Sequence, residues 1–160
     1  MTKINSIFLD TSFLIRLMKP DDPSHAHAQA YLRRFAADGT ALYSSTIAAA
    51  EFGVAGTIEG LPLRIVPMQA FNLDHARQAA IFARAAYNAR RKGAVVLPKR
   101  VLIPNDTKIM AQAHLVGASY LVGRDRNLGS VLGFLQQEGL TTVQYLDITI
   151  APTNFFGELF

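Results

Sequence analysis

Short apolar runs alternate with longer amphipathic segments along the 160-residue chain. The apolar runs have the length and composition of buried strands, at 4–9, 40–45, 118–123 and 141–146, with a strand or extended loop at 63–68. The segments between them predict helices at 12–18, 26–37, 46–59, 72–93, 104–117 and 127–137. This alternation predicts an α/β fold, with a mostly parallel central sheet of four or five strands and helices on both faces.

No internal repeat or linker divides the chain, so we expect one domain. It is expected to span residues 1–147, followed by a tail at 148–160. The tail carries three phenylalanines, Phe155, Phe156 and Phe160. We expect them to pack on the domain itself or on a dimer seam.

The middle of the chain carries a strongly basic block. The formal net charge is +4, and no acidic residue lies between Asp74 and Asp106. On the long helix expected in this region, arginines spaced seven residues apart form one stripe, Arg77, Arg84 and Arg91. Lys99 and Arg100 follow in the loop “LPKR”. Such a block attracts nucleic acid, although a solvated helix face followed by a basic loop explains it equally well.

The composition removes several classes of protein. Half of the residues are hydrophobic and 18% are charged, as in folded globular proteins. The absence of cysteine excludes disulfide frameworks and thiolate metal sites and fits a reducing cytosol. The apolar run before Asp10 is shorter than a secretory hydrophobic region, and no stretch reaches the roughly 20 apolar residues of a membrane span. We therefore expect a soluble, cytoplasmic protein without a membrane partner.

Four acidic residues interrupt apolar segments. Asp10 follows the first expected strand, Asp125 follows the strand “YLV”, and Asp106 lies in the first turn of the helix opened by “IPN”. These three positions share the carboxyl edge of a parallel sheet, where open α/β folds bind ligands. Glu51 lies on the inward side of the helix expected at 46–59, with no Lys or Arg at a helical spacing that would pair with it.

Each of these acids also has a simpler explanation. Asp10 could cap the helix that follows it, and Asp106 could be an ordinary first-turn acid. Asp125 could be a turn residue paired with Arg124 or Arg126. Several carboxylates in one cleft nevertheless repel one another unless a cation binds, and an oxygen-only donor set indicates Mg²⁺ or Mn²⁺. The four histidines are expected in surface or packing roles, because none forms an H-E-x-x-H pair.

With these residues in place, the chain resembles the PIN-domain ribonucleases, most closely the VapC-type toxins of bacterial and archaeal toxin–antitoxin pairs. The matching stretches are “FLDTSFLIRLM”, “YSSTIAAAEF”, “IPNDTKIMAQAHLVGASYLVGRDRNL” and the closing strand “VQYL”. They fall between residue 7 and about residue 146, and residues 61–103 match only as a variable helical insert. The specific feature is their ordered set: an Asp after the first strand, an inward Glu, Asn-Asp before a helix, and Arg-Asp after a strand.

The resemblance implies roles for individual residues. The catalytic, metal-binding acids would be Asp10, Glu51, Asp106 and Asp125. Ser12 matches the small hydroxyl residue that supports the first Asp, and Asn105 precedes the third acid as it often does in the family. Gly123 stands where the family usually has Thr or Ser, and Asn127 where many relatives have a further Asp. These two departures lose a supporting hydroxyl and a charged ligand, but all four acids remain, so we expect an active enzyme.

The resemblance also implies a reaction and partners. The reaction is metal-assisted hydrolysis of RNA phosphodiester bonds, leaving 5′-phosphate and 3′-hydroxyl ends. RNA would be contacted by the basic residues Arg77, Arg84, Arg91, Lys99, Arg100, Arg124 and Arg126. The chain would form a homodimer and be silenced by a cognate antitoxin whose C-terminal segment fills the active-site groove.

Two other functions remain open from the sequence. The chain could be a PIN-fold RNA-binding module that has lost hydrolysis, which would explain Gly123 and Asn127. It could also be a phosphoryl-accepting receiver domain, which is α/β with acidic strand ends. That fold needs a pair of acids after its first strand and a lysine after a late one. Here Asp10 stands alone and “LVGRD” supplies no lysine. The RNA-binding module is therefore the stronger alternative.

Overall fold

The computed structural model describes residues 4–93 and 104–157. Its strands are β1 (Ser6–Leu9), β2 (Ala41–Ser45), β3 (Met68–Gln69), β4 (Tyr120–Gly123) and β5 (Gln144–Asp147). Its helices are α1 (Thr11–Met18), α2 (His25–Ala37), α3 (Thr46–Phe52), the 3₁₀ helix η1 (Ile58–Gly60), α4 (Leu73–Arg91), α5 (Pro104–Leu115), α6 (Arg126–Gln137) and α7 (Pro152–Phe156).

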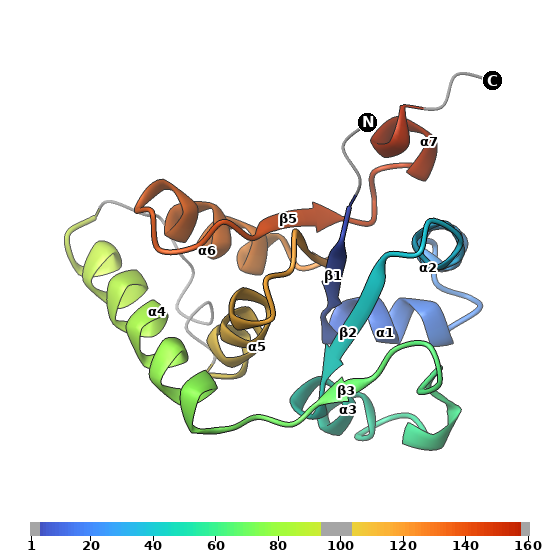
Figure 1. The fold of residues 1–160 in the computed structure, drawn as a ribbon, viewed down its shortest axis with the longest axis horizontal. Coiled ribbons are helices and arrows are strands. Elements are labelled where there is room, and N and C mark those ends of the chain that lie inside the picture. Colours follow the sequence, from blue (N-terminus) through green and yellow to red (C-terminus); the bar gives the residue numbers. More distant parts are fainter. Residues whose placement is uncertain (1–3, 94–103, 158–160) are drawn as a thin grey trace.

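The described strands form one parallel sheet in the order β3-β2-β1-β4-β5. The chain moves outward from β1 to β2 and β3, then crosses back to β4 and β5. Because parallel connections are right-handed, these two directions place helices on opposite faces of the sheet. Figure 1 shows this arrangement, with α1 and α2 on one side and α4, α5 and α6 on the other. The predicted α/β fold is confirmed.

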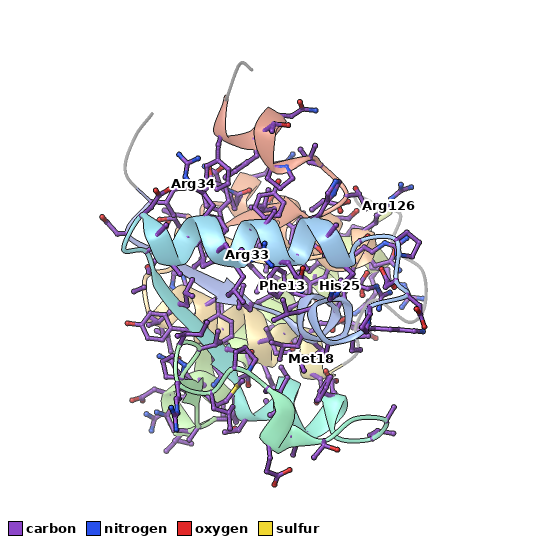
Figure 2. The ribbon with its side chains drawn as sticks, turned by 90° about the vertical axis from the view of Figure 1, so that its right-hand side faces the viewer. Phe13, Met18, His25, Arg33, Arg34 and Arg126 are labelled. Carbon is purple, nitrogen blue, oxygen red and sulfur yellow. The ribbon has the colours of Figure 1, made fainter. Side chains whose placement is uncertain are left out.

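The first strand lies at the centre of the core. Its residues Ile7, Phe8 and Leu9 are fully buried, as expected for a strand with helices on both faces. In Figure 2, which faces α2, this helix crosses the view with Arg33 and Arg34 on it, and the buried Phe13 lies nearby. Over residues 4–93 and 104–157, none of the helices is both long enough and apolar enough to cross a lipid bilayer.

The described part of the tail packs on the domain. Phe155 lies edge-on to Tyr31, with ring centroids 5.8 Å apart, and Phe156 contacts Phe35 with centroids 5.4 Å apart. Tyr31 and Phe35 belong to α2, so α7 extends the aromatic core over this helix. Phe160 lies outside the described residues.

The helix predicted at 46–59 ends at Phe52, so the prediction is wrong for residues 53–59. α3 begins after Ser45, whose hydroxyl accepts a hydrogen bond from the Ile47 N–H at 2.9 Å, and it ends at Phe52. The chain then turns, and a Cβ on Gly56 would lie 2.6 Å from the Phe52 ring. The C-cap of α3 is Gly53, and glycine disfavours a continuing helix. Glu51 is consequently in the last turn of a short helix.

Candidate active site

Three helix N-termini meet at the carboxyl edge of the sheet. Asp10 is the N-cap of α1, Asp125 is the N-cap of α6, and Asp106 lies in the first turn of α5. β1 and β4 are neighbours, with Leu9 paired to Val122, so Asp10 and Asp125 follow adjacent strand ends. The parallel topology therefore brings to one edge three acids that are far apart in the sequence.

Asp10 is buried, with 3% of its surface exposed. Its Oδ1 atom accepts hydrogen bonds from the Ser12 hydroxyl at 2.6 Å and from the Phe13 N–H at 3.0 Å. Burial raises the pKa of this carboxyl to about 6; the two hydrogen bonds lower it in part, and the charge of Asp125 raises it further. Asp10 thus caps α1, as one explanation from the sequence proposed, but the cap uses only its Oδ1 atom.

Glu51 connects two of the converging helices. Its Oε1 atom accepts a hydrogen bond from the Asn105 side-chain amide at 2.8 Å, and its Oε2 atom accepts one from the Thr11 hydroxyl. Thr11 is the first residue of α1, and Asn105 lies in the first turn of α5. The sequence reasoning missed Thr11, although a hydroxyl residue directly after Asp10 was a usable signal.

Asp106 is the acid whose pKa responds to the charges of the other three. It is half-buried, and burial is the main cause that raises its pKa to about 7. The charges of Asp125, Asp10 and Glu51 raise it further, in that order. The three other acids therefore all lie within electrostatic reach of Asp106. Asp106 is also the group that reports their repulsion most strongly.

Asp125 uses one carboxylate oxygen to cap α6. Its Oδ1 atom accepts hydrogen bonds from the Asn127 N–H at 2.9 Å and from the Leu128 N–H at 3.3 Å. Asn127 contributes its backbone to this cap, and the residue is exposed. The Asn127 side chain takes no part in this cap, so the supporting role expected for it stays a prediction.

Within residues 4–93 and 104–157, no arginine or lysine forms an ion pair with any of the four acids. Arg124 instead lies 3.7 Å from Asp22, which also pairs with Arg16 at 3.0 Å. The Arg124 N–H donates to the Ser12 hydroxyl at 2.7 Å, so its backbone supports the residue that holds Asp10. The proposed pairing of Asp125 with Arg124 or Arg126 is therefore not found among these residues.

The donor set fits a hard divalent cation in its chemistry. Carboxylate oxygens that repel one another without a local cation are the ligands that Mg²⁺ and Mn²⁺ prefer. Among the described residues, however, no three acidic or histidine side chains are close enough to hold one ion together. The expected convergence is therefore partial, and binding would require the carboxylates to move toward one another. The histidine Nδ1 atoms pair instead with backbone or hydroxyl groups of Arg16, Ile148, Asn72 and Thr141.

Gly123 has a steric function that the sequence did not reveal. We interpreted this position as a lost hydroxyl. In the structure, a Cβ at Gly123 would lie 2.5 Å from Oδ2 of Asp10. The Asp10 carboxylate therefore occupies the space that a side chain on β4 would fill. Asp147, which ends β5 and pairs with Gly123, is a further acid at this edge that the sequence reasoning missed. The strand-end argument used for Asp10 would have found it.

The predicted RNA-contacting residues are distributed unevenly. Arg77, Arg84 and Arg91 are exposed on α4, which packs against α5 and α6. Arg126 is exposed at the N-terminus of α6 and lies near the margin of the view in Figure 2. Arg124 is half-buried beside Asp22. Lys99 and Arg100 lie outside the described residues.

Several solved structures share this fold. FitAcB from Neisseria gonorrhoeae has a TM-score of 0.62 at 18% identity, covering 90% of this chain and 99% of that chain. VapBC2 from Rickettsia felis, bound to a DNA fragment from its promoter, has a TM-score of 0.57 at 15% identity, covering 89% and 99%. VapC20 from Mycobacterium tuberculosis, a sarcin–ricin loop cleaving toxin, has a TM-score of 0.53 at 18% identity, covering 86% and 98%.

The sequence itself also matches a family. No curated protein matches the chain at the level of sequence. The family model for the PIN domain, however, matches residues 7–131, which include all four acids of the candidate site. This match spans most of the chain and agrees with the strand order and the acidic edge described above. The chain belongs to the PIN domain family.

Proposed function

We propose that this protein is a metal-dependent endoribonuclease and the toxin of a type II toxin–antitoxin pair. The observation that carries the proposal is the set of carboxylates at the edge of the sheet, which no described arginine or lysine neutralises and which raise the pKa of Asp106. Membership of the PIN domain family and the fold shared with a sarcin–ricin loop cleaving toxin support it.

Asp10, Asp106 and Asp125 would hold Mg²⁺ or Mn²⁺, with Glu51 completing the site. A bound divalent ion lowers the pKa of a water molecule and offsets charge on the phosphate oxygens. Two hydrogen bonds hold the Glu51 carboxylate at the edge of the site, and in the proposed reaction Glu51 would accept a proton there. Ser12 fixes one oxygen of Asp10, and this leaves the other oxygen available.

The direct test is cleavage by the purified protein of a panel that includes ribosomal and transfer RNA fragments. We expect cleavage with Mg²⁺ or Mn²⁺, none after EDTA treatment, and products with 5′-phosphate ends. RNA binding without cleavage under any of these metal conditions would contradict the proposal. It would favour the alternative, a PIN-fold RNA-binding module.

The exposed arginines of α4 are proposed to contact the phosphate backbone of RNA. Replacing Arg84 and Arg91 by alanine should weaken binding to all RNA sequences alike, because phosphate contacts carry no sequence information. Two lost contacts should reduce the slope of log affinity against log salt by about 1.4. A matched double variant at Arg33 and Arg64, which are exposed outside α4, should leave that slope unchanged. Equal slopes for the two variants would show that these arginines of α4 do not contact RNA.

The proposed partners are a second copy of the chain and an antitoxin protein. Two of the similar structures are complexes, VapBC2 and FitAcB, which supports a protein partner for this chain as well. A pocket that contains Glu51 offers a place for its segment, and its other lining residues are Ile15, Met18, Lys19, Phe52, Ala55 and Gly56. This pocket joins apolar side chains to one of the four acids. A gene next to the one that encodes this chain should therefore encode a protein that blocks cleavage when both are expressed.

A further inference from the structure

Tyr145 brings a buried hydroxyl to the candidate site. It lies on β5, and its ring packs so closely against α6 that a Cβ on Gly129 would lie 2.6 Å from it. Gly129 is one turn after Asp125, and its N–H donates to the Asp125 carbonyl at 3.0 Å. The phenol ring is therefore fixed beneath the first turn of α6, the turn that Asp125 caps.

The Tyr145 hydroxyl is buried without a well-formed hydrogen bond to any described residue. Burial raises the pKa of this phenol strongly, and the negative charges of Asp10, Asp147 and Asp125 raise it further, while the Asp125 N–H opposes the shift. The hydroxyl is therefore within electrostatic reach of the acidic edge. A buried hydroxyl without a partner is destabilising, and phenylalanine would fill the same space without that cost.

The Oδ2 atom of Asp10 complements this hydroxyl. Oδ1 of Asp10 accepts the hydrogen bonds from the Ser12 hydroxyl and the Phe13 N–H, whereas no described residue makes a well-formed hydrogen bond to Oδ2, although the Ser12 backbone N–H also acts on this carboxylate. Oδ2 lies over Gly123, 2.5 Å from where a Cβ would stand. Gly123 and Tyr145 are on the neighbouring strands β4 and β5, two positions apart in register. The carboxylate oxygen of Asp10 that takes no part in the helix cap and a hydroxyl without an acceptor thus share one face of the sheet.

We propose that Tyr145 is a positioning residue whose hydroxyl, unpartnered in this arrangement, donates to Oδ2 of Asp10 once the carboxylates move together around a cation. Glycine at 123 makes room for the Asp10 carboxylate, and glycine at 129 makes room for the Tyr145 ring. The hydroxyl would hold the Asp10 carboxylate in the orientation that faces Asp106 and Asp125. This inference rests on the proposed function, because that orientation matters only for a bound cation and the hydrolysis it supports.

The test compares Tyr145→Phe with Tyr31→Phe. Tyr31, which lies on α2, is a matched control. Its hydroxyl is also buried, but it donates a hydrogen bond to the Ile150 carbonyl at 2.9 Å. We expect Tyr145→Phe to bind Mn²⁺ about 10-fold more weakly in an electron paramagnetic resonance titration, which counts bound ion without RNA. We expect its kcat for RNA cleavage to fall by a similar factor at unchanged KM, because a buried hydroxyl does not touch RNA. Its melting temperature should stay the same or rise.

The control should show the opposite pattern. Tyr31→Phe should melt at a lower temperature and bind Mn²⁺ like the wild-type protein. In wild-type protein labelled with ¹³C at tyrosine Cζ, the Tyr145 resonance should shift on addition of Mg²⁺ and the Tyr31 resonance should not. If Tyr145→Phe binds Mn²⁺ and cleaves RNA like the wild type, this inference is wrong and the proposed function stands. If the wild-type protein binds no divalent ion, both fail together.

Discussion

Asp10→Asn is expected to abolish RNA cleavage and to make the folded protein more stable above pH 7. The carboxyl is buried, and its pKa of about 6 lies above its ordinary value of 3.8. At pH 8 the folded protein therefore holds a charged group where burial disfavours charge. A shift of this size corresponds to about 3 kcal/mol of unfolding free energy, as an upper bound. Asparagine removes the charge and keeps an oxygen that can accept from Ser12 and Phe13.

Urea unfolding at several pH values measures this effect. The gain from Asp10→Asn should be largest above pH 7 and should shrink as the pH falls from about 6 to below 4. In that range the folded wild-type protein takes up its proton first, and the unfolded chain follows. Asp21→Asn makes the same change of charge at an exposed position and should leave both stability and cleavage close to wild type. A variant that is less stable at pH 8, or that still cleaves RNA, would refute this account of Asp10.

Helix capping and cation binding turn out to be compatible uses of the same acids. Asp10 and Asp125 each give their Oδ1 atom to backbone N–H groups at the start of a helix. A helix N-terminus favours an ionised carboxylate, so the caps offset part of the mutual repulsion. In each residue the other carboxylate oxygen takes no part in these cap hydrogen bonds. The sequence presented capping and metal binding as competing explanations, whereas the structure allows both.

The sequence was informative where function follows from local pattern. An apolar strand followed by an acid placed Asp10 and Asp125 at the correct edge, because every strand of a parallel sheet ends on the same side. The end of α3 was missed although Gly53 and Gly56 follow Phe52 closely, because the hydrophobic periodicity was extended through two glycines that disfavour a helix interior.

The features that remained hidden join residues far apart in the chain. Gly123 reads as a missing hydroxyl until the carboxylate of Asp10, more than 100 positions earlier, is seen to fill its space. Tyr145 reads as an ordinary strand residue until Gly129 and the acids are placed around it. Sequence pattern identifies the charged groups of such a site, but the uncharged residues that make room for them become visible only in three dimensions.

Divalent-ion binding is expected to strengthen steeply with pH. Burial and neighbouring acids raise the pKa of Asp106 to about 7, and burial raises that of Asp10 to about 6. Below these values each carboxyl holds a proton that a cation must displace, and each displaced proton changes affinity up to about 10-fold per pH unit. With two such groups, Mn²⁺ should bind roughly 100-fold more tightly at pH 7.5 than at pH 5.5 and change little above pH 8.

The stability of the metal-free protein should move in the opposite direction. Between about pH 4 and pH 7 the folded state keeps protons on Asp10 and Asp106 that the unfolded chain has released, so rising pH lowers its unfolding free energy. Mn²⁺ should reverse that loss, and the rise in melting temperature on adding it should therefore grow from pH 5.5 to pH 7.5. Asp106→Asn removes one of the two protons, so its Mn²⁺ affinity should be lower and should depend less on pH. An affinity that is independent of pH in the wild-type protein would mean that these carboxylates do not bind the ion, and the repulsion among them would then need another explanation.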